Sequence, residues 1–127
     1  MLEPLCGYLL LAEHLLEGPT AFGDAWNFGP AEDDARTVAW IVARVVEQWG
    51  EDAAWHVTTG DAPHEAHHLK VDASRARTRL GWRPRLRLDD ALTWTVQWHR
   101  RLNAGEPALA LADEQLSRYG AMELAGQ

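Results

Sequence analysis

Apolar residues recur with helical spacing in the middle of the chain and predict a helix over residues 38–49. They fall at i, i+3, i+4, i+7, i+8 and i+11, which gathers them on one face of a helix. The positions are Val38, Ile41, Val42, Val45, Val46 and Trp49. Gly50 follows as the expected C′ residue. The acidic residues Glu32, Asp33 and Asp34 are expected to favour the start of this helix through its dipole.

The first predicted helix is apolar on most of its sides. Pro4 suits its first turn, the run from Leu5 to Leu16 is interrupted in its middle only by Glu13 and His14, and Gly18 ends it. A helix of this kind must be covered on most sides. A chain of 127 residues has limited material to cover it, so we expect this helix to need a partner.

The stretch from Asp72 to Arg101 predicts two helices joined by an extended crossing. Asp72 or Ser74 is expected to cap the first helix. Gly81 stands where a left-handed C′ residue is wanted, and Trp82 is expected to pack back on the helix. Beyond the crossing, Leu88 and Asp89 predict a staple and an N-cap for the second helix. Its apolar stripe would be Ala91, Trp94, Trp98 and Leu102.

Two short strands and a last helix complete the expected elements. Residues 25–30 end in Gly-Pro and residues 55–59 alternate, so both predict strands. Residues 108–124 predict a helix with Leu109, Ala112, Leu116 and Tyr119 roughly on one face. The fold class expected is α/β, a mostly helical lobe with two short strands. It would form one domain over 1–127, with a core at about 2–104 and a helical extension at about 108–124.

Composition narrows the class of protein. The net charge of −7 argues against a nucleic-acid partner, which usually requires a basic surface. The single cysteine excludes an internal disulfide and fits a reducing compartment. No basic region precedes the first apolar run, which is too short to span a bilayer. We therefore expect a cytoplasmic protein without a membrane partner.

Two motifs of dinucleotide-dependent reductases are absent from the sequence. The ten glycines form no Gly-x-Gly-x-x-Gly pattern, which lets a backbone approach a pyrophosphate. The only lysine is Lys70, and Ala66 stands four residues before it, so no Tyr-x-x-x-Lys pair exists. We expect no cofactor-binding and no catalytic residues in this chain.

Several motifs resemble extended short-chain dehydrogenase/reductases, the family of nucleotide-sugar dehydratases and epimerases. They are Asp-x-Ser-Arg-Ala-x-x-x-Leu-Gly-Trp-x-Pro at 72–84 and a helix that ends in Trp-His at 98–99. The opening Leu-Glu-Pro-Leu-Cys-Gly-Tyr-Leu and the segment Pro-His-Glu-Ala-His at 63–67 are similar, more narrowly, to the CDP-glucose 4,6-dehydratases of that family. The likeness runs from Leu2 to about Tyr119.

The resemblance implies a C-terminal substrate-binding lobe whose Rossmann lobe is missing. The intact enzyme would use NAD to convert a nucleotide-sugar such as CDP-glucose to a 4-keto-6-deoxy sugar, with a homodimer possible. This chain alone would bind no NAD, and a separate N-terminal Rossmann lobe would be its partner. In the family, the loop matching residues 60–68 borders the nucleotide-sugar pocket. The candidate substrate-binding residues are therefore His64, Glu65 and His68. His68 departs from the family, which usually has Tyr there.

Other interpretations of these residues stay open. Glu65 and His64 would pair only locally if the loop lies away from the pocket. The cluster of His64, His67 and His68 could bind a metal only if the segment were helical, whereas Pro63 favours an extended loop. The arginines at 75, 77, 79, 83, 85 and 87 predict a solvated face, with one or two that could face a diphosphate. The chain could instead be a stand-alone binding module or a lobe of a related epimerase.

Overall fold

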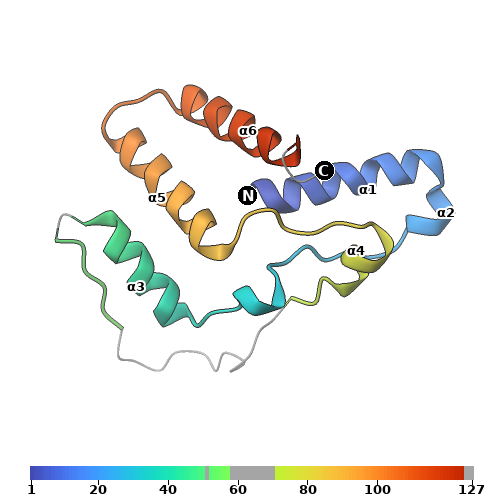
Figure 1. The fold of residues 1–127 in the computed structure, drawn as a ribbon, viewed down its shortest axis with the longest axis horizontal. Coiled ribbons are helices and arrows are strands. Elements are labelled where there is room, and N and C mark those ends of the chain that lie inside the picture. Colours follow the sequence, from blue (N-terminus) through green and yellow to red (C-terminus); the bar gives the residue numbers. More distant parts are fainter. Residues whose placement is uncertain (51, 58–70, 125–127) are drawn as a thin grey trace.

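The computed structural model describes residues 1–50, 52–57 and 71–124, with the backbone alone at 19, 20, 123 and 124. All regular structure in these ranges is helical (Figure 1). The elements are α1 (Leu2–Glu17), α2 (Pro19–Phe22), the 3-10 helix η1 (Glu32–Asp34), α3 (Val38–Trp49), α4 (Ser74–Arg79), α5 (Leu88–Asn103) and α6 (Ala108–Leu124). The mostly helical character is confirmed, whereas the two expected strands are not found in the described ranges.

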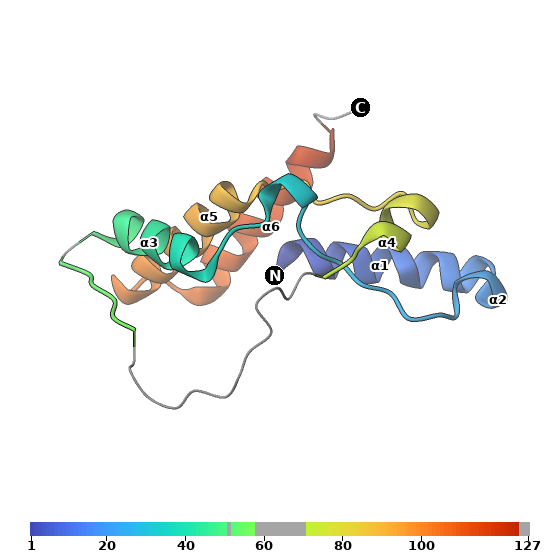
Figure 2. The same cartoon turned by 90° about the horizontal axis from the view of Figure 1, so that it is seen from below.

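The helices form two groups. Helices α1, α2 and α4 make one group, and α3, α5 and α6 make the other (Figures 1 and 2). Two irregular segments, residues 23–31 and 80–87, connect them, and the first residues of α1 lie close to the end of α6. The two groups therefore meet near the N-terminus of the chain.

The first group is built around the turn that follows α4. Ala73, Ala76, Leu80 and Trp82 are buried there, and Leu10 and Leu11 of α1 pack against them. The Phe28 ring meets Trp82 edge-on, with the ring centroids 5.1 Å apart. On its other side Phe28 lies directly against Gly7 of α1. These contacts join three segments that are distant in sequence.

Local signals around α4 are confirmed. The Ser74 N–H donates to Oδ1 of Asp72 at 2.8 Å, as expected for the start of the helix. Gly81 has φ +66°, the left-handed conformation that a C′ residue adopts. The Trp82 N–H returns to the carbonyl of Ala76 at 3.1 Å, and this bond folds the Trp82 side chain back on the helix.

The strand expected over 25–30 is an irregular segment instead. It runs beside residues 71–73, where the Asn27 side chain bonds to the backbone: its Nδ2 donates to the Asp72 carbonyl at 3.3 Å. Gly29 lies close against Val71. No ladder of backbone hydrogen bonds joins the two segments within the described residues. A β-rich sequence makes a strand only when a neighbour pairs with it, and here none does.

The second strand, expected over residues 55–59, is also not formed at the residues that the structure describes. Residues 53–57 have no regular structure, and Val57 is 73% exposed. An apolar side chain that faces solvent lacks the packing that stabilises a half-buried strand. The end of this prediction, residues 58 and 59, lies outside the described residues.

Helix α3 has the predicted bounds, but its start is stabilised differently. Thr37 is the N-cap, and its hydroxyl accepts from the Trp40 N–H at 3.2 Å. Gly50 follows with φ +69°, as expected of a C′ residue. The acidic run at 32–34 forms η1 and is separated from α3 by three residues, so its expected action on the α3 dipole is wrong. Helix dipole effects fall off within the first turn.

Helix α5 begins at Leu88, and Asp89 is not its N-cap as expected. Asp89 lies inside the first turn, where its two carboxylate oxygens accept from Arg44 of α3 at 2.6 and 2.9 Å. The Leu88 N–H donates to Asp34 Oδ2 at 3.2 Å. Trp94 of the predicted stripe is buried, as is Val96, which the stripe did not include.

Helix α6 has the predicted bounds, and its predicted apolar face is only partly buried. Leu111 and Tyr119 are buried, whereas Leu109 and Leu116 are 73% and 55% exposed. The contact with α5 selects this face, because Gln115 Nε2 donates to the Trp94 carbonyl at 2.9 Å. In addition, the Arg118 guanidinium stacks 4.2 Å from the Trp94 ring centroid.

No helix in the described part of the chain combines the length and apolar character needed to cross a membrane.

Candidate functional site

The three predicted substrate-binding residues, His64, Glu65 and His68, lie outside the described residues. The described chain stops at Val57 and resumes at Val71. Val71 lies against Gly29, and the carbonyl of Asp72 accepts from the side-chain amide of Asn27. Residues 71 and 72 therefore lie beside residues 27–29.

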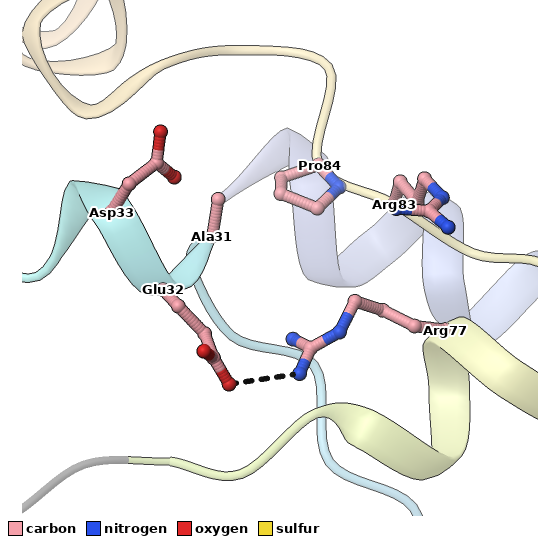
Figure 3. A pocket seen from close by; sticks show the side chains of 6 residues that line it. All are labelled: Ala31, Glu32, Asp33, Arg77, Arg83 and Pro84. Carbon is pink, nitrogen blue, oxygen red and sulfur yellow. Dashed lines mark hydrogen bonds and ion pairs between the residues drawn. The ribbon is translucent and has the colours of Figure 1, made fainter.

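A polar pocket of about 350 Å³ lies close to this region (Figure 3). It is formed by η1, α4 and the crossing after Trp82, and its lining residues are Ala31, Glu32, Asp33, Arg77, Arg83 and Pro84. In Figure 3 the side chains of Glu32 and Arg77 point toward one another across the pocket. Both signs of charge therefore face the same small volume.

The charges of this pocket are largely satisfied within the chain. Arg77 Nη2 lies 3.5 Å from Glu32 Oε1 and donates to Ser74 Oγ at 2.9 Å. Asp33 accepts from Arg87 at 3.0 Å, and this hydrogen bond holds the pKa of Asp33 below its ordinary value. Arg83 makes no hydrogen bond or ion pair with the residues described. A phosphate group would compete with Glu32 for Arg77, so the pocket is a weak candidate for the diphosphate.

Three other arginines between residues 75 and 87 make contacts that stabilise the fold. Arg75 and Arg79 lie 3.3 and 3.9 Å from the Asp24 carboxylate, and their guanidinium groups lie over the Trp26 ring. Arg87 pairs with Asp33 and Asp34. The side chains of these three arginines are exposed, as expected for a solvated face, but each pairs with a carboxylate.

A larger groove of about 750 Å³ runs between α1, α6 and residues 81–85. Its lining is mainly apolar and consists of Leu2, Leu5, Cys6, Tyr8, Leu9, Leu10, Glu13, Gly81, Trp82, Arg83, Arg85, Leu116, Tyr119 and Gly120. Clefts of this size and polarity are typical of binding sites in proteins.

A hydrogen-bonded cluster closes one end of this groove, and sequence reasoning missed it. Glu3 Oε1 accepts from the backbone N–H groups of Arg85 and Leu86 at 2.9 and 2.7 Å, and Oε2 accepts from the Tyr119 hydroxyl at 2.9 Å. The Arg85 guanidinium lies 4.8 Å from the Tyr119 ring centroid and donates to Cys6 Sγ at 3.4 Å. The only signal in the sequence was an acidic residue in a first helical turn.

Burial raises the pKa of the Tyr119 hydroxyl well above its ordinary value, and its hydrogen bond to the Glu3 carboxylate acts in the same direction. Both effects disfavour a phenolate, because the deprotonated oxygen would be poorly hydrated and would face another negative charge. Tyr119 therefore stays a neutral donor. As such it holds α6 to the start of α1.

A metal site needs a cluster of ligand side chains, and a dinucleotide site needs a glycine-rich turn before a helix. Within the described residues, no three His, Cys, Asp or Glu side chains gather as metal ligands. The histidine cluster at 64–68 lies outside this range, so its metal interpretation stays a hypothesis. The helices α1, α3 and α5 begin after Met1, Thr37 and Arg87, and none follows a glycine-rich turn of the kind that holds a pyrophosphate.

Comparison with known proteins identifies a relative of this chain. No protein-family model matches it. A CDP-glucose 4,6-dehydratase of Salmonella typhimurium is 43% identical to it over 119 residues. This match covers 94% of the chain but only 33% of the Salmonella enzyme, so the chain spans about one third of that relative's length. The resemblance predicted from residues 2–9, 63–67 and 72–84 is confirmed: the chain is similar to the C-terminal portion of a CDP-glucose 4,6-dehydratase.

Proposed function

We propose that this chain forms one wall of the nucleotide-sugar site of an enzyme of the CDP-glucose 4,6-dehydratase type. The identity of 43% across 94% of the chain is the observation that carries the proposal. Such extensive identity retains buried positions and loops together, and it supports a shared role for the shared part. The activity itself, dehydration of CDP-glucose to a 4-keto-6-deoxy sugar, would belong to an assembly that also contains the other two thirds.

His64, Glu65 and His68 are the residues that we propose to contact the substrate. A carboxylate accepts hydrogen bonds from amino or hydroxyl groups, and imidazole N–H groups donate to phosphate oxygens. Glu65 would thus bind the sugar or the base, and the two histidines the diphosphate. The support for this role is the likeness of residues 63–67 to the CDP-glucose 4,6-dehydratases, within a match of 43% identity over 119 residues.

The cofactor and the catalytic residues are proposed to lie on a Rossmann lobe other than this chain. CDP-glucose 4,6-dehydratases are NAD-dependent, and neither the glycine fingerprint nor a Tyr-x-x-x-Lys pair is present in this sequence. We therefore assign no hydride transfer or proton transfer to its residues. Their role is to bind and orient a nucleotide-sugar, in a cytoplasmic enzyme.

A stand-alone binding module is the alternative function, and the structure of α1 counts against it. A self-sufficient module would cover its most apolar helix with its own residues. In the described structure Leu9 and Leu16 of α1 are 69% and 88% exposed. This exposure favours a part of a larger assembly.

A chimera tests the proposed function. The matched third of the Salmonella enzyme is replaced by this chain, and turnover of CDP-glucose is measured with NAD. We expect the chimera to turn over CDP-glucose, and the same enzyme truncated before the matched third to be inactive. In the chimera, Glu65→Gln should raise KM for CDP-glucose by about tenfold, the effect of one lost hydrogen bond to a charged group. A folded chimera that neither binds nor converts CDP-glucose would contradict the proposal.

A further inference from the structure

One face of α1 is apolar and uncovered in the described structure. Leu5 is 48% exposed, Tyr8 56% and Leu9 69%. These three side chains follow one another along about one turn of the helix. Single exposed apolar residues are common, but a contiguous apolar surface usually marks a contact with another protein or a ligand.

The opposite face of α1 already packs within the chain. Gly7 lies directly against the Phe28 ring, and Leu10 and Leu11 pack on the cluster around Trp82. Tyr8 lies at the border of the two faces, because its ring meets Phe28 edge-on with the centroids 5.3 Å apart. Leu5 and Leu9 point away from this packed face. A helix with apolar residues on two faces is typical of an element between two packed layers.

Helix α6 extends this uncovered surface. Leu116 is 55% exposed and lines the same groove of about 750 Å³ as Leu5, Tyr8 and Leu9. The hydrogen bond of 2.9 Å between the Tyr119 hydroxyl and Glu3 fixes α6 to the first turn of α1. The two helices thus present one surface, which we call the α1–α6 surface: Leu5, Tyr8 and Leu9 of α1 with Leu116 of α6.

We propose that the α1–α6 surface docks the polypeptide that corresponds to the other two thirds of a CDP-glucose 4,6-dehydratase. This inference rests on the proposed function and adds the surface through which the two parts meet. The occupant is inferred from the extent of the match. The match includes 94% of this chain but only 33% of the Salmonella enzyme, so about two thirds of that enzyme have no counterpart in this chain. The docking face of the occupant should be apolar, since the lining of the groove is mainly so.

A co-purification experiment tests this surface. The remaining two thirds of the Salmonella enzyme carries an affinity tag and is co-expressed with this full chain. We expect the parent chain to be retained in equal amount with the tagged polypeptide. Leu9→Asp should reduce the retained amount by at least about tenfold, because a charge at the centre of an apolar contact is desolvated without a partner.

Leu109→Asp is the matched control. Leu109 is a leucine of α6 with an exposure of 73%, close to the 69% of Leu9, but it does not line the groove. This variant should be retained like the parent. Far-ultraviolet circular dichroism and thermal unfolding of both variants check that the helices still form.

Three results would overturn the inference. They are retention of folded Leu9→Asp at the parent level, an equal loss with Leu109→Asp, and a homodimer of the chain that Leu9→Asp dissociates while the tagged polypeptide retains nothing. The two experiments separate failure of this docking surface from failure of the proposed function. An active chimera with no Leu9-dependent docking would refute the surface alone, and docking with an inactive chimera would refute the function alone.

Discussion

The Tyr119 hydroxyl donates a hydrogen bond of 2.9 Å to Glu3 Oε2, and so the last helix of the chain is joined to the first turn of α1. The other oxygen of Glu3 binds the backbone of residues 85 and 86. One carboxylate therefore connects α1, the crossing and α6. Three segments that are far apart in sequence depend on it.

Tyr119→Phe removes this connection and keeps the buried ring. We expect the free energy of unfolding to fall by about 1–3 kcal/mol, because the lost bond is to a charged acceptor in a partly buried position. Chemical denaturation followed by circular dichroism measures the change. Tyr8→Phe is the control, since Tyr8 is 56% exposed and should change stability by less than about 0.5 kcal/mol.

The stability of the chain should decrease at alkaline pH through the same residue. The pKa of Tyr119 is raised in the folded chain above its ordinary 10.0, so above that pH the unfolded chain releases a proton that the folded chain keeps. The unfolded state then binds fewer protons, and the free energy of unfolding falls as pH rises. The contribution is fully present below pH 10.0. Denaturation between pH 8 and 11 should show a shallower decline in Tyr119→Phe, and an unchanged slope would contradict the prediction.

Gly7 is required by the close approach of the Phe28 ring to α1. In Gly7→Ala the added Cβ would overlap Phe28, whose ring is held by Trp82. We expect a loss of about 1–3 kcal/mol, typical of an overpacked core, despite the better helix propensity of alanine. Gly120→Ala is the matched control, because no atom lies near its added Cβ, and it should stabilise the chain by about 0.5–1 kcal/mol. Thermal and chemical unfolding compare the two variants.

Asp34 stabilises the start of α5 from a distant segment. Its carboxylate accepts from the Leu88 N–H at 3.2 Å and pairs with Arg87 at 3.1 Å, and the residue is buried. Asp34→Ala should therefore cost about 0.5–2 kcal/mol, the usual loss on removal of a helix cap. Asp33→Ala, which removes an exposed carboxylate next to it, should cost less. Equal losses in chemical denaturation would show that Asp34 does not act as a cap.

Elements that depend on neighbouring residues could be predicted from the sequence. The turn from Asp72 to Trp82 and the bounds of α3 and α6 follow from caps, glycines and spacing, and the structure confirms them. Features that depend on distant residues could not. Asp89 has the sequence of an N-cap, yet it lies inside the first turn and binds Arg44. The Leu88 N–H donates instead to the carboxylate of the distant Asp34. The residues at 25–30 have strand propensity, but no strand lies beside them in the described part of the chain.

The candidate site was predictable only through resemblance. The sequence around His64, Glu65 and His68 predicts an extended loop, and such a prediction says little about which side chains face a substrate. By contrast, the exposed side of α1 was expected from composition alone, because few polar positions interrupt its apolar run. Leu109 and Leu116 share the predicted face of α6 with Tyr119 but are exposed, because α5 contacts another side of the helix.

The pairing of arginines with the acidic segment has a consequence for ionic conditions. Residues 75–87 are connected to residues 24–34 by ion pairs of 3.0 to 3.9 Å whose side chains are mostly exposed. Exposed pairs weaken as dissolved salt screens them over a Debye length of about 8 Å at physiological strength and about 3 Å at 1 M. The seam between these two segments is therefore a salt-sensitive part of the molecule, whereas the packing of Phe28 between Gly7 and Trp82 should tighten in sulfate.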